Sequence, residues 1–232
     1  GEICDILEKY HVTAVELGAQ STNDKVLAMN RRGHTREDIF HSARLLKECG
    51  FELGLQMMTG LYGSNDEDSI GTARDIISLS PDTARIYPTV VIENTELAEL
   101  YRNGEYRPQT PEEAVVLCAK LLPMFERAGI KVIRLGLHSG GDVEGSFVAG
   151  AYHPALREMC EGHIYFDIIN RALSGKEKGK YIIYVAPREV SKASGQRRCN
   201  IEKLRELSYE CKIKENAALS ARDITLEKVN LL

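Results

Sequence analysis

Two periods of apolar residues alternate along the first 137 positions of the chain. Runs with the helical period of three to four lie at Ile3–Tyr10, 35–50, Asp66–Leu79 and Pro111–Ala128. Short apolar runs typical of strands lie between them, at Thr13–Gly18, Phe51–Met58, Ala84–Ile92 and Ile130–Leu137. The pattern therefore predicts helices and strands in strict alternation.

Such alternation is typical of a parallel sheet whose strands are joined by crossover helices. We therefore expect the α/β class, either as an open sheet or as part of a (β/α) barrel, with ligands at the carboxyl ends of the strands. Thr35, with Asp38 three residues later, predicts a capped helix start. Pro88 predicts that the third strand bends or stops pairing there.

The rest of the chain predicts two further parts. Residues 139–175 are less regular and predict a helical extension, with a helix near Pro154–Leu173. The Gly- and Lys-rich run 174–180 predicts a linker. Residues 176–232 predict a small α+β appendage in the order strand, helix, loop, helix, strand. We therefore expect three parts, at 1–138, 139–175 and 176–232.

Polar residues share one face of each predicted strand. Because side chains alternate along a strand, the residues of one face are Glu16, Gly18 and Gln20; Gly54, Gln56 and Met58; Arg85, Tyr87 and Thr89; Arg134, Gly136 and His138. Buried polar groups need partners, so such a face fits a ligand cavity better than an apolar core. The alternative is a set of polar residues at exposed strand ends.

Composition and charge narrow the class of protein. Hydrophobic residues make up 43% and charged residues 28%, as in soluble globular proteins. No run approaches the ~20 apolar residues of a membrane span, so we expect a cytoplasmic protein without membrane contact. Residues 1–175 carry 17 Lys and Arg against 26 Asp and Glu, whereas residues 176–232 carry 13 against 8. The basic tail suggests a polyanionic partner, and a solvated charged surface is the alternative.

The cysteine spacing argues against a metal site within these residues. The six cysteines are Cys4, Cys49, Cys118, Cys160, Cys199 and Cys211. None forms a CxxC or CxxxC pair, so we expect no metal ligands. Scattered cysteines in a non-secreted α/β chain are typical of reduced thiols.

Several segments together resemble one enzyme family. They are ELGAQSTNDKVLAMNRRGHT (16–35), LGLQMMTGLYG (53–63), ARIYPTVVIENTEL (84–97), IKVIRLGLHS (130–139) and AGAYHPALREM (149–159). In order and spacing they resemble the radical S-adenosylmethionine (SAM) enzymes related to the Elongator catalytic subunit and to oxygen-independent coproporphyrinogen III oxidase. The resemblance covers roughly residues 1–170.

The resemblance implies a fold, a cofactor set and site residues. The family fold is a partial (β/α)₆ barrel in which a [4Fe–4S] cluster, held by CxxxCxxC, cleaves SAM to a 5′-deoxyadenosyl radical. By this match, Gln20 would contact the SAM ribose, Arg32 would hold the SAM carboxylate and Gln56 would face SAM. Glu16 and Tyr87 are further candidates for the cofactor site, and Arg134 and His138 for lining the substrate.

The chain also departs from the family pattern, because CxxxCxxC is missing and no cysteine here replaces it. We therefore expect the carboxy-terminal half of such a barrel, inactive by itself because the cluster-binding half is absent, within a parent protein that is an enzyme. The strand at Thr13–Gly18 would then lie at an open edge. We expect another chain or the tail to cover it.

The tail carries a second resemblance. Its predicted order of elements, with SGQRRCNIEKL (194–204) across the loop, is similar to the core of a KH RNA-binding domain, whose GxxG loop clamps the nucleotide backbone. Gly195, Arg197 and Arg198 would then bind RNA, although arginine replaces the second glycine. The alternative is a small helical tail that packs on the barrel.

Three functions remain open from the sequence. The leading hypothesis is an Elongator-like radical SAM enzyme that modifies RNA, with transfer RNA as the expected partner. The second is a noncatalytic RNA-binding protein that uses the basic tail. The third is a small-molecule radical SAM enzyme of the coproporphyrinogen oxidase kind.

Overall fold

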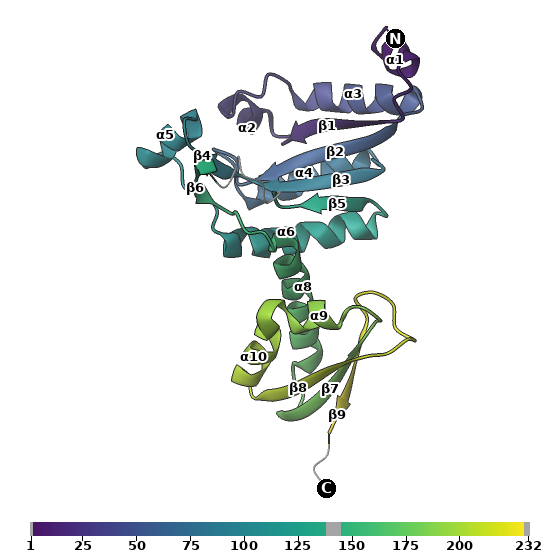
Figure 1. The fold of residues 1–232 in the computed structure, drawn as a ribbon, viewed down its shortest axis with the longest axis vertical. Coiled ribbons are helices and arrows are strands. Elements are labelled where there is room, and N and C mark those ends of the chain that lie inside the picture. The colour runs from purple at the N-terminus through teal and green to yellow at the C-terminus, as the bar shows by residue number, and fades with distance from the viewer. Residues whose placement is uncertain (1, 138–144, 230–232) are drawn as a thin grey trace. The chain divides into compact units, whose positions relative to one another are not determined.

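The computed structural model describes residues 2–137 and 145–229, which form two compact units, Gly1–Pro154 and Ala155–Leu232. The first unit is built on a parallel sheet in the order β1-β2-β3-β5 (Figure 1). Its strands are β1 (Ala14–Gln20), β2 (Glu52–Thr59), β3 (Thr83–Pro88) and β5 (Lys131–Leu135). The predicted α/β class with a parallel sheet is confirmed.

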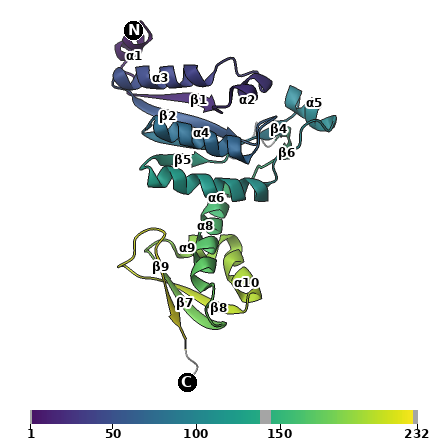
Figure 2. The ribbon, with the colours of Figure 1, turned by 180° about the vertical axis from the view of Figure 1, so that it is seen from behind.

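Helices lie before and between the strands of the first unit, and the three longest cover one face of the sheet (Figure 2). They are α1 (Glu2–Lys9), α2 (Asp24–Met29), α3 (Arg36–Glu48), α4 (Asp66–Ser78), α5 (Glu96–Arg102) and α6 (Pro111–Arg127). Capping boxes at Thr35, Asn65 and Thr110 fix the starts of α3, α4 and α6. The cap predicted at Thr35 is therefore confirmed, whereas α2 and α5 were not predicted.

The core of the first unit lies between the sheet and these helices. Leu53, Leu55 and Met57 of β2 and Ile86 of β3 are fully buried there. The alternate residues of the same strands, among them Gln56 and Arg85, are only half-buried. One face of the sheet is thus apolar and covered, which leaves the polar residues on the other.

The chain leaves the sheet at Pro88, as the sequence predicts. The run predicted as one strand divides into β3 and a separate β4 (Val90–Ile92). β4 pairs in antiparallel fashion with β6 (Phe147–Gly150) in a sheet of its own.

The second unit has a mixed three-stranded sheet in the order β8-β7-β9. Its elements are α8 (Leu156–Leu173), β7 (Gly179–Val185), α9 (Val190–Ser194), the 3₁₀ turn η1 (Gln196–Arg198), α10 (Cys199–Glu206), β8 (Tyr209–Glu215) and β9 (Ile224–Lys228). β7 runs parallel to β8 and antiparallel to β9. The predicted order strand, helix, loop, helix, strand is present, and β9 is an addition.

α8 belongs to the core of the second unit. Its Tyr165, Ile169 and Leu173 pack against Ile183 and Leu204. The compact units divide at Pro154/Ala155, ahead of this helix. The expected division into 1–138, 139–175 and 176–232 stays a prediction.

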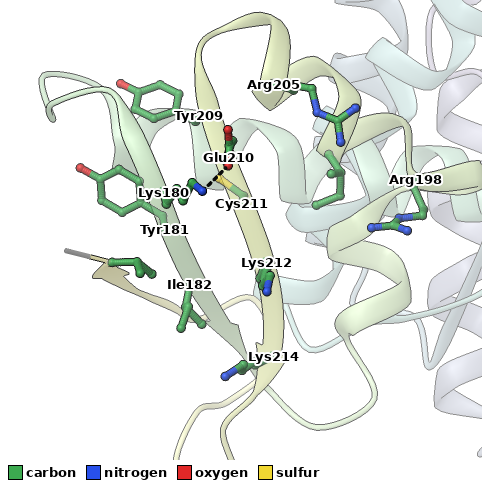
Figure 3. A pocket seen from close by; sticks show the side chains of 12 residues that line it. Lys180, Tyr181, Ile182, Arg198, Arg205, Tyr209, Glu210, Cys211, Lys212 and Lys214 are labelled. Carbon is green, nitrogen blue, oxygen red and sulfur yellow. Dashed lines mark ion pairs between the residues drawn. The ribbon is translucent and has the colours of Figure 1, made fainter. Parts of the chain in front are cut away.

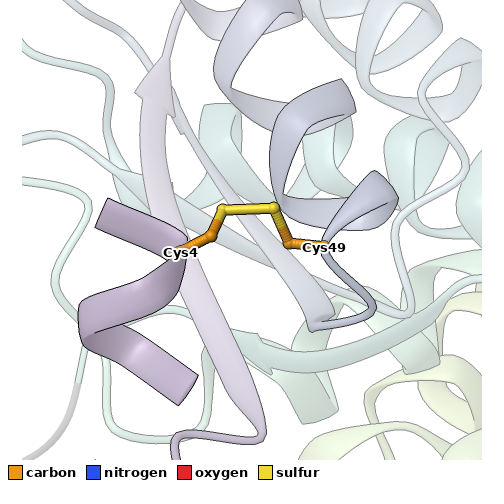
Figure 4. The surroundings of a disulfide bond; sticks show 2 residues. All are labelled: Cys4 and Cys49. Atoms are coloured by element: carbon orange, nitrogen blue, oxygen red, sulfur yellow. A yellow bond between two sulfur atoms is a disulfide. The ribbon is translucent and has the colours of Figure 1, made fainter. Parts of the chain in front are cut away.

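Cys4 of α1 and Cys49, just after α3, form a disulfide (Figure 4). The expectation of reduced thiols is therefore wrong for this pair. Residues 45 apart in sequence meet because α1 ends just before β1 and α3 ends just before β2, and these two strands are parallel and start side by side at Ala14 and Glu52. Cys118, Cys160, Cys199 and Cys211 are free thiols.

β1 is an edge strand, because it pairs with β2 alone among the described residues. The expected cover of this edge by another chain or by the tail stays a prediction. Within the described part of the chain, no helix is long and apolar enough to cross a membrane.

Candidate functional site

A polar cluster lies on the uncovered face of the first unit's sheet, around Glu16. The Arg85 guanidinium donates to the Glu16 carboxylate at 2.7 Å (Nε to Oε1), and the Gln56 amide donates at 3.2 Å (Nε2 to Oε2). These residues come from β1, β3 and β2, and parallel pairing places the three strands side by side. The side chains of Glu16 and Arg85 are 31% and 30% exposed, so the cluster is accessible to a ligand.

Tyr87 extends this cluster toward the carboxyl end of β3. The Arg85 Nη1 donates to the Tyr87 hydroxyl at 3.2 Å. Hydrogen bonds to Tyr87 and then to Glu16 raise the pKa of Arg85, so its charge is permanent. Arg134 of β5 stands directly opposite Arg85 in the pairing register, and the described residues provide it with no side-chain partner. The face therefore presents two neighbouring cations and one carboxylate.

Glycines make room for the cluster. A Cβ on Gly54 would lie 2.7 Å from Glu16 Cγ and 3.0 Å from Thr83 Oγ1. A Cβ on Gly18 would lie 2.3 Å from Gln20 Nε2. Glu16 and Gln20 therefore lie over backbone that only glycine leaves open.

Gln20 ends β1 with a left-handed backbone, at φ 61°. This conformation is unfavourable for a residue with a side chain. It coincides with a shift of the register between Gly18 and Gln20. The turn holds the Gln20 amide beside Gly18, at the carboxyl end of the strand.

Arg32 approaches the same end of the sheet from the loop after α2. Its Nη2 lies 3.3 Å from Met58 Sδ on β2, a weak contact for a guanidinium. The ring nitrogens of His34 lie 3.1 Å from the Arg32 carbonyl oxygen and 3.3 Å from that of Ala19. His34 thus ties the Arg32 loop to the end of β1, next to Gln20.

The structure brings most of the sequence-predicted residues to one face. Gln56 donates to Glu16, Arg85 links Glu16 to Tyr87, and Gln20 and Arg32 lie at the adjoining strand ends. Thr89 is buried and donates to the Thr59 carbonyl instead. His138 lies outside the described residues.

The donor set suits a small polar ligand better than a metal ion. Two amides, a carboxylate, a phenol and guanidinium groups match hydroxyl, ammonium and carboxylate groups. Within residues 2–137 and 145–229, no group of three His, Cys, Asp or Glu side chains is placed to hold a metal ion. These residues fit SAM and do not fit an iron–sulfur cluster.

The RNA-binding candidates of the tail lie at η1 in the second unit. Gly195 ends α9 at φ 75°, and Arg197 and Arg198 follow with left-handed backbones at φ 52° and 64°. The buried Asn200 amide donates to the carbonyl oxygens of Gly162 and Ala193, which fixes the turn. Both arginine side chains are exposed.

Sequence reasoning missed several residues around both sites. Arg85 was noticed only as one residue of a strand face, yet it links Glu16 to Tyr87. The sequence did not indicate that His34 ties the Arg32 loop to β1, because folding alone brings its ring near the two carbonyl oxygens. The excess of Lys and Arg in residues 176–232 indicated a basic tail, but it did not show where the lysines of β7 and β8 lie in the fold (Figure 3).

Two family models match consecutive parts of the chain. A model described as the radical SAM superfamily matches residues 1–76. A model described as the radical SAM C-terminal domain matches residues 81–165.

Curated proteins and a solved structure agree with these models. A tRNA uridine(34) acetyltransferase of Methanocaldococcus jannaschii is 39% identical over 125 residues, 51% of this chain and 23% of the relative. Elongator complex protein 3 of Homo sapiens is 33% identical over 124 residues, 50% of this chain and 22% of the relative. The archaeal Methanocaldococcus infernus Elp3 with an N-terminal deletion superposes with TM-score 0.60 and 30% identity, over 74% of this chain and 39% of that one. The chain thus spans less than a quarter of the length of these two curated relatives.

Proposed function

The chain belongs to the radical SAM superfamily and is similar to its Elongator-type members, and from this premise we propose that it is part of an enzyme that modifies transfer RNA by SAM-dependent radical chemistry. The polar cluster around Glu16 carries the proposal, because it lies on the uncovered sheet face beside Gln20 and Arg32. The similarity to the tRNA uridine(34) acetyltransferase of M. jannaschii supports transfer RNA as the substrate.

Each residue of the proposed SAM site has a distinct task. The Gln20 amide both donates and accepts, which suits ribose hydroxyls. The Arg32 guanidinium suits the methionyl carboxylate, because its contact with Met58 Sδ is easily exchanged for a charged acceptor. The side chains of Gln56, Glu16 and Tyr87 complete the lining of the proposed SAM site. Arg134 and His138 would line the adjoining substrate site.

SAM bound beside a reduced iron–sulfur cluster supplies a 5′-deoxyadenosyl radical in this family. The 232 residues contain no CxxxCxxC. We therefore expect that this polypeptide by itself binds SAM and does not cleave it.

Calorimetric titration of SAM tests the proposal, both with this chain and with a polypeptide that includes CxxxCxxC and a reconstituted cluster. Losing a charge-assisted pair costs about 2 kcal/mol, so Arg32→Ala should weaken binding by roughly 10- to 100-fold. Arg31→Ala is the matched control, because the neighbouring Arg31 pairs with Glu96 at 2.7 Å and is 76% exposed. Absence of SAM binding by the cluster-loaded protein, or equal losses in the two variants, would contradict the proposal.

The basic tail favours a second candidate, a noncatalytic RNA-binding protein that uses Gly195, Arg197 and Arg198. Its support is the excess of 13 Lys and Arg over 8 Asp and Glu in residues 176–232. RNA binding without SAM binding would favour this candidate. SAM binding without RNA binding would favour a small-molecule radical SAM enzyme.

A further inference from the structure

His34 stands between the two segments that carry the proposed SAM contacts of Gln20 and Arg32. Its Nδ1 lies 3.1 Å from the carbonyl oxygen of Arg32, and its Nε2 lies 3.3 Å from the carbonyl oxygen of Ala19. Ala19 directly precedes Gln20 at the end of β1. The imidazole ring therefore bridges the backbone of the Arg32 loop and the backbone at the Gln20 turn.

The local backbone brings the ring to this position. Gly33 has a left-handed conformation, at φ 71°, and it turns the chain so that His34 reaches back to the carbonyl group of Arg32. His34 directly precedes Thr35, whose capping box with Asp38 fixes the start of α3. The ring is thus held in place from the side of α3, by a helix start that needs no ligand.

The Arg32 loop has few other attachments at this point. The Arg32 backbone N–H donates to the Leu27 carbonyl oxygen at 3.0 Å, and its side chain makes only the weak contact with Met58 Sδ. Within the described part of the chain, the ring of His34 is the one hydrogen-bond partner of the Arg32 carbonyl oxygen. The position of the Arg32 guanidinium therefore depends on His34.

Both contacts need a proton on the ring nitrogen. A carbonyl oxygen only accepts hydrogen bonds, and a neutral imidazole carries a proton on just one of its nitrogens. In the neutral ring, the lone pair of the other nitrogen would face a carbonyl oxygen at 3.1 or 3.3 Å. The imidazolium cation donates to both oxygens at once. The bridge is therefore complete only when His34 is charged.

The charges near the ring are compatible with this state. The charged and titratable side chains on the segments that meet there are Arg31 and Arg32 of its own loop, Asp24 of α2, and Arg36, Glu37, Asp38 and His41 of α3. The carboxyl end of β1 adds none. Arg31 and Arg36 are each engaged in an ion pair at 2.7 Å. Hydrogen bonds from Thr35 lower the pKa of Asp38, and the charge of His34 lowers it further, so this carboxylate stabilises a charged ring.

We propose that His34, in its charged form, is a positioning residue for SAM, which holds the Arg32 loop and the Gln20 turn in the relative position that one SAM molecule needs. The inference rests on the proposed function, in which Gln20 meets the ribose and Arg32 meets the carboxylate. The ring acts through the backbone next to these two residues and not on the ligand. Because SAM binds best to the complete bridge, its binding favours the imidazolium. SAM affinity therefore falls as pH rises through the titration of the ring.

Calorimetric titration of SAM between about pH 5.5 and 7.5 tests the inference, with this chain and with the cluster-loaded polypeptide. His34→Gln keeps an amide donor and loses the charge. It should weaken SAM binding at least about fivefold at the acid end and by less at the alkaline end. His41→Gln is the matched control, because His41 is an exposed histidine of α3 with no hydrogen bond among the described residues. Groups of SAM itself titrate alike in every variant.

Nitrogen NMR of the histidine side chains reads the ring directly in the unaltered chain. Addition of SAM should move the titration of His34 to higher pH, because the bound state favours the imidazolium. The titration of His41 should stay where it is.

The outcomes separate the inference from the proposed function. Equal SAM affinities of His34→Gln and the unaltered chain, an equal loss at every pH, or a His34 titration that SAM does not move would each overturn the role of His34 and leave the SAM site standing. Absence of SAM binding by the unaltered, cluster-loaded protein would overturn both. Circular dichroism and the unfolding midpoint establish that the variants are folded, and if His34→Gln is not, the NMR titration decides.

Discussion

At the scale of single residues, the candidate SAM site depends on where side chains are absent as much as on where they are present. Gly54 is buried beneath Glu16, and a Cβ there would lie 2.7 Å from Glu16 Cγ. Glu16 would have to shift, and its bonds to Arg85 and Gln56 would be lost or lengthened. The two neighbouring cations Arg85 and Arg134 would then face each other without their carboxylate.

We therefore predict that Gly54→Ala lowers the free energy of unfolding by about 1 to 3 kcal/mol, the usual cost of overpacking. Gly71→Ala is the matched control, because no atom lies within 4 Å of an added Cβ at this position in α4. Alanine should stabilise the helix there by about 0.5 to 1 kcal/mol. Urea unfolding measures both variants, and equal effects would contradict the packing argument.

At the scale of elements, α3 and α4 are joined by a bidentate ion pair. Arg36, the first residue of α3, donates to the Asp75 carboxylate through Nε at 2.8 Å and Nη2 at 2.7 Å. The hydrogen bond from Arg36 is the main cause that lowers the pKa of Asp75. A lowered pKa in the folded state means that the pair stabilises above the unfolded pKa of about 3.9 and that this stability is lost as pH falls further.

Asp75→Asn should therefore destabilise the chain by about 0.5 to 1 kcal/mol near pH 7, a modest value because the pair is partly exposed. The difference from the unaltered chain should shrink as pH falls below about 4. Unfolding midpoints measured between pH 3 and 7 check this. Glu37→Gln is the control, since this exposed carboxylate of α3 has no ion pair among the described residues. A constant difference at every pH would exclude Asp75 as the titrating group.

The elements also show what the sequence could predict. All four strands of the parallel sheet were predicted, because each is a compact apolar run between amphipathic helices. α2 and α5, of six and seven residues, are too short for a helical period to be recognised. The groove of about 600 Å³ beside β8 could not be predicted, because it depends on the register that places Ile182 next to Lys212 (Figure 3). For the same reason the sequence placed Glu16 and Arg85 on strand faces but did not show that Arg85 links Glu16 to Tyr87.

At the scale of the whole molecule, the chain consists of two units with separate cores, and the disulfide belongs to the first. The pairing of Cys4 with Cys49 was missed, because a separation of 45 residues in sequence says nothing about proximity. A bridge closing a loop of this length contributes roughly 4 kcal/mol by restricting the unfolded chain.

Reduction should therefore lower the stability of the first unit and leave that of the second unchanged. Cys4→Ser with Cys49→Ser should match the reduced chain, with an unfolding free energy about 3 to 4 kcal/mol below the oxidised value. Cys199→Ser, which alters an exposed free thiol, should change nothing. Hydrogen exchange resolved by segment measures each unit, and equal protection before and after reduction would contradict the bridge.

The turn at Arg197 and Arg198 has a consequence for how this protein can evolve. Glycine would adopt both left-handed conformations at no steric cost, whereas arginine holds them against its own preference. If the proposed RNA binding by Arg197 and Arg198 holds, glycine at these two positions would stabilise the fold and weaken that binding.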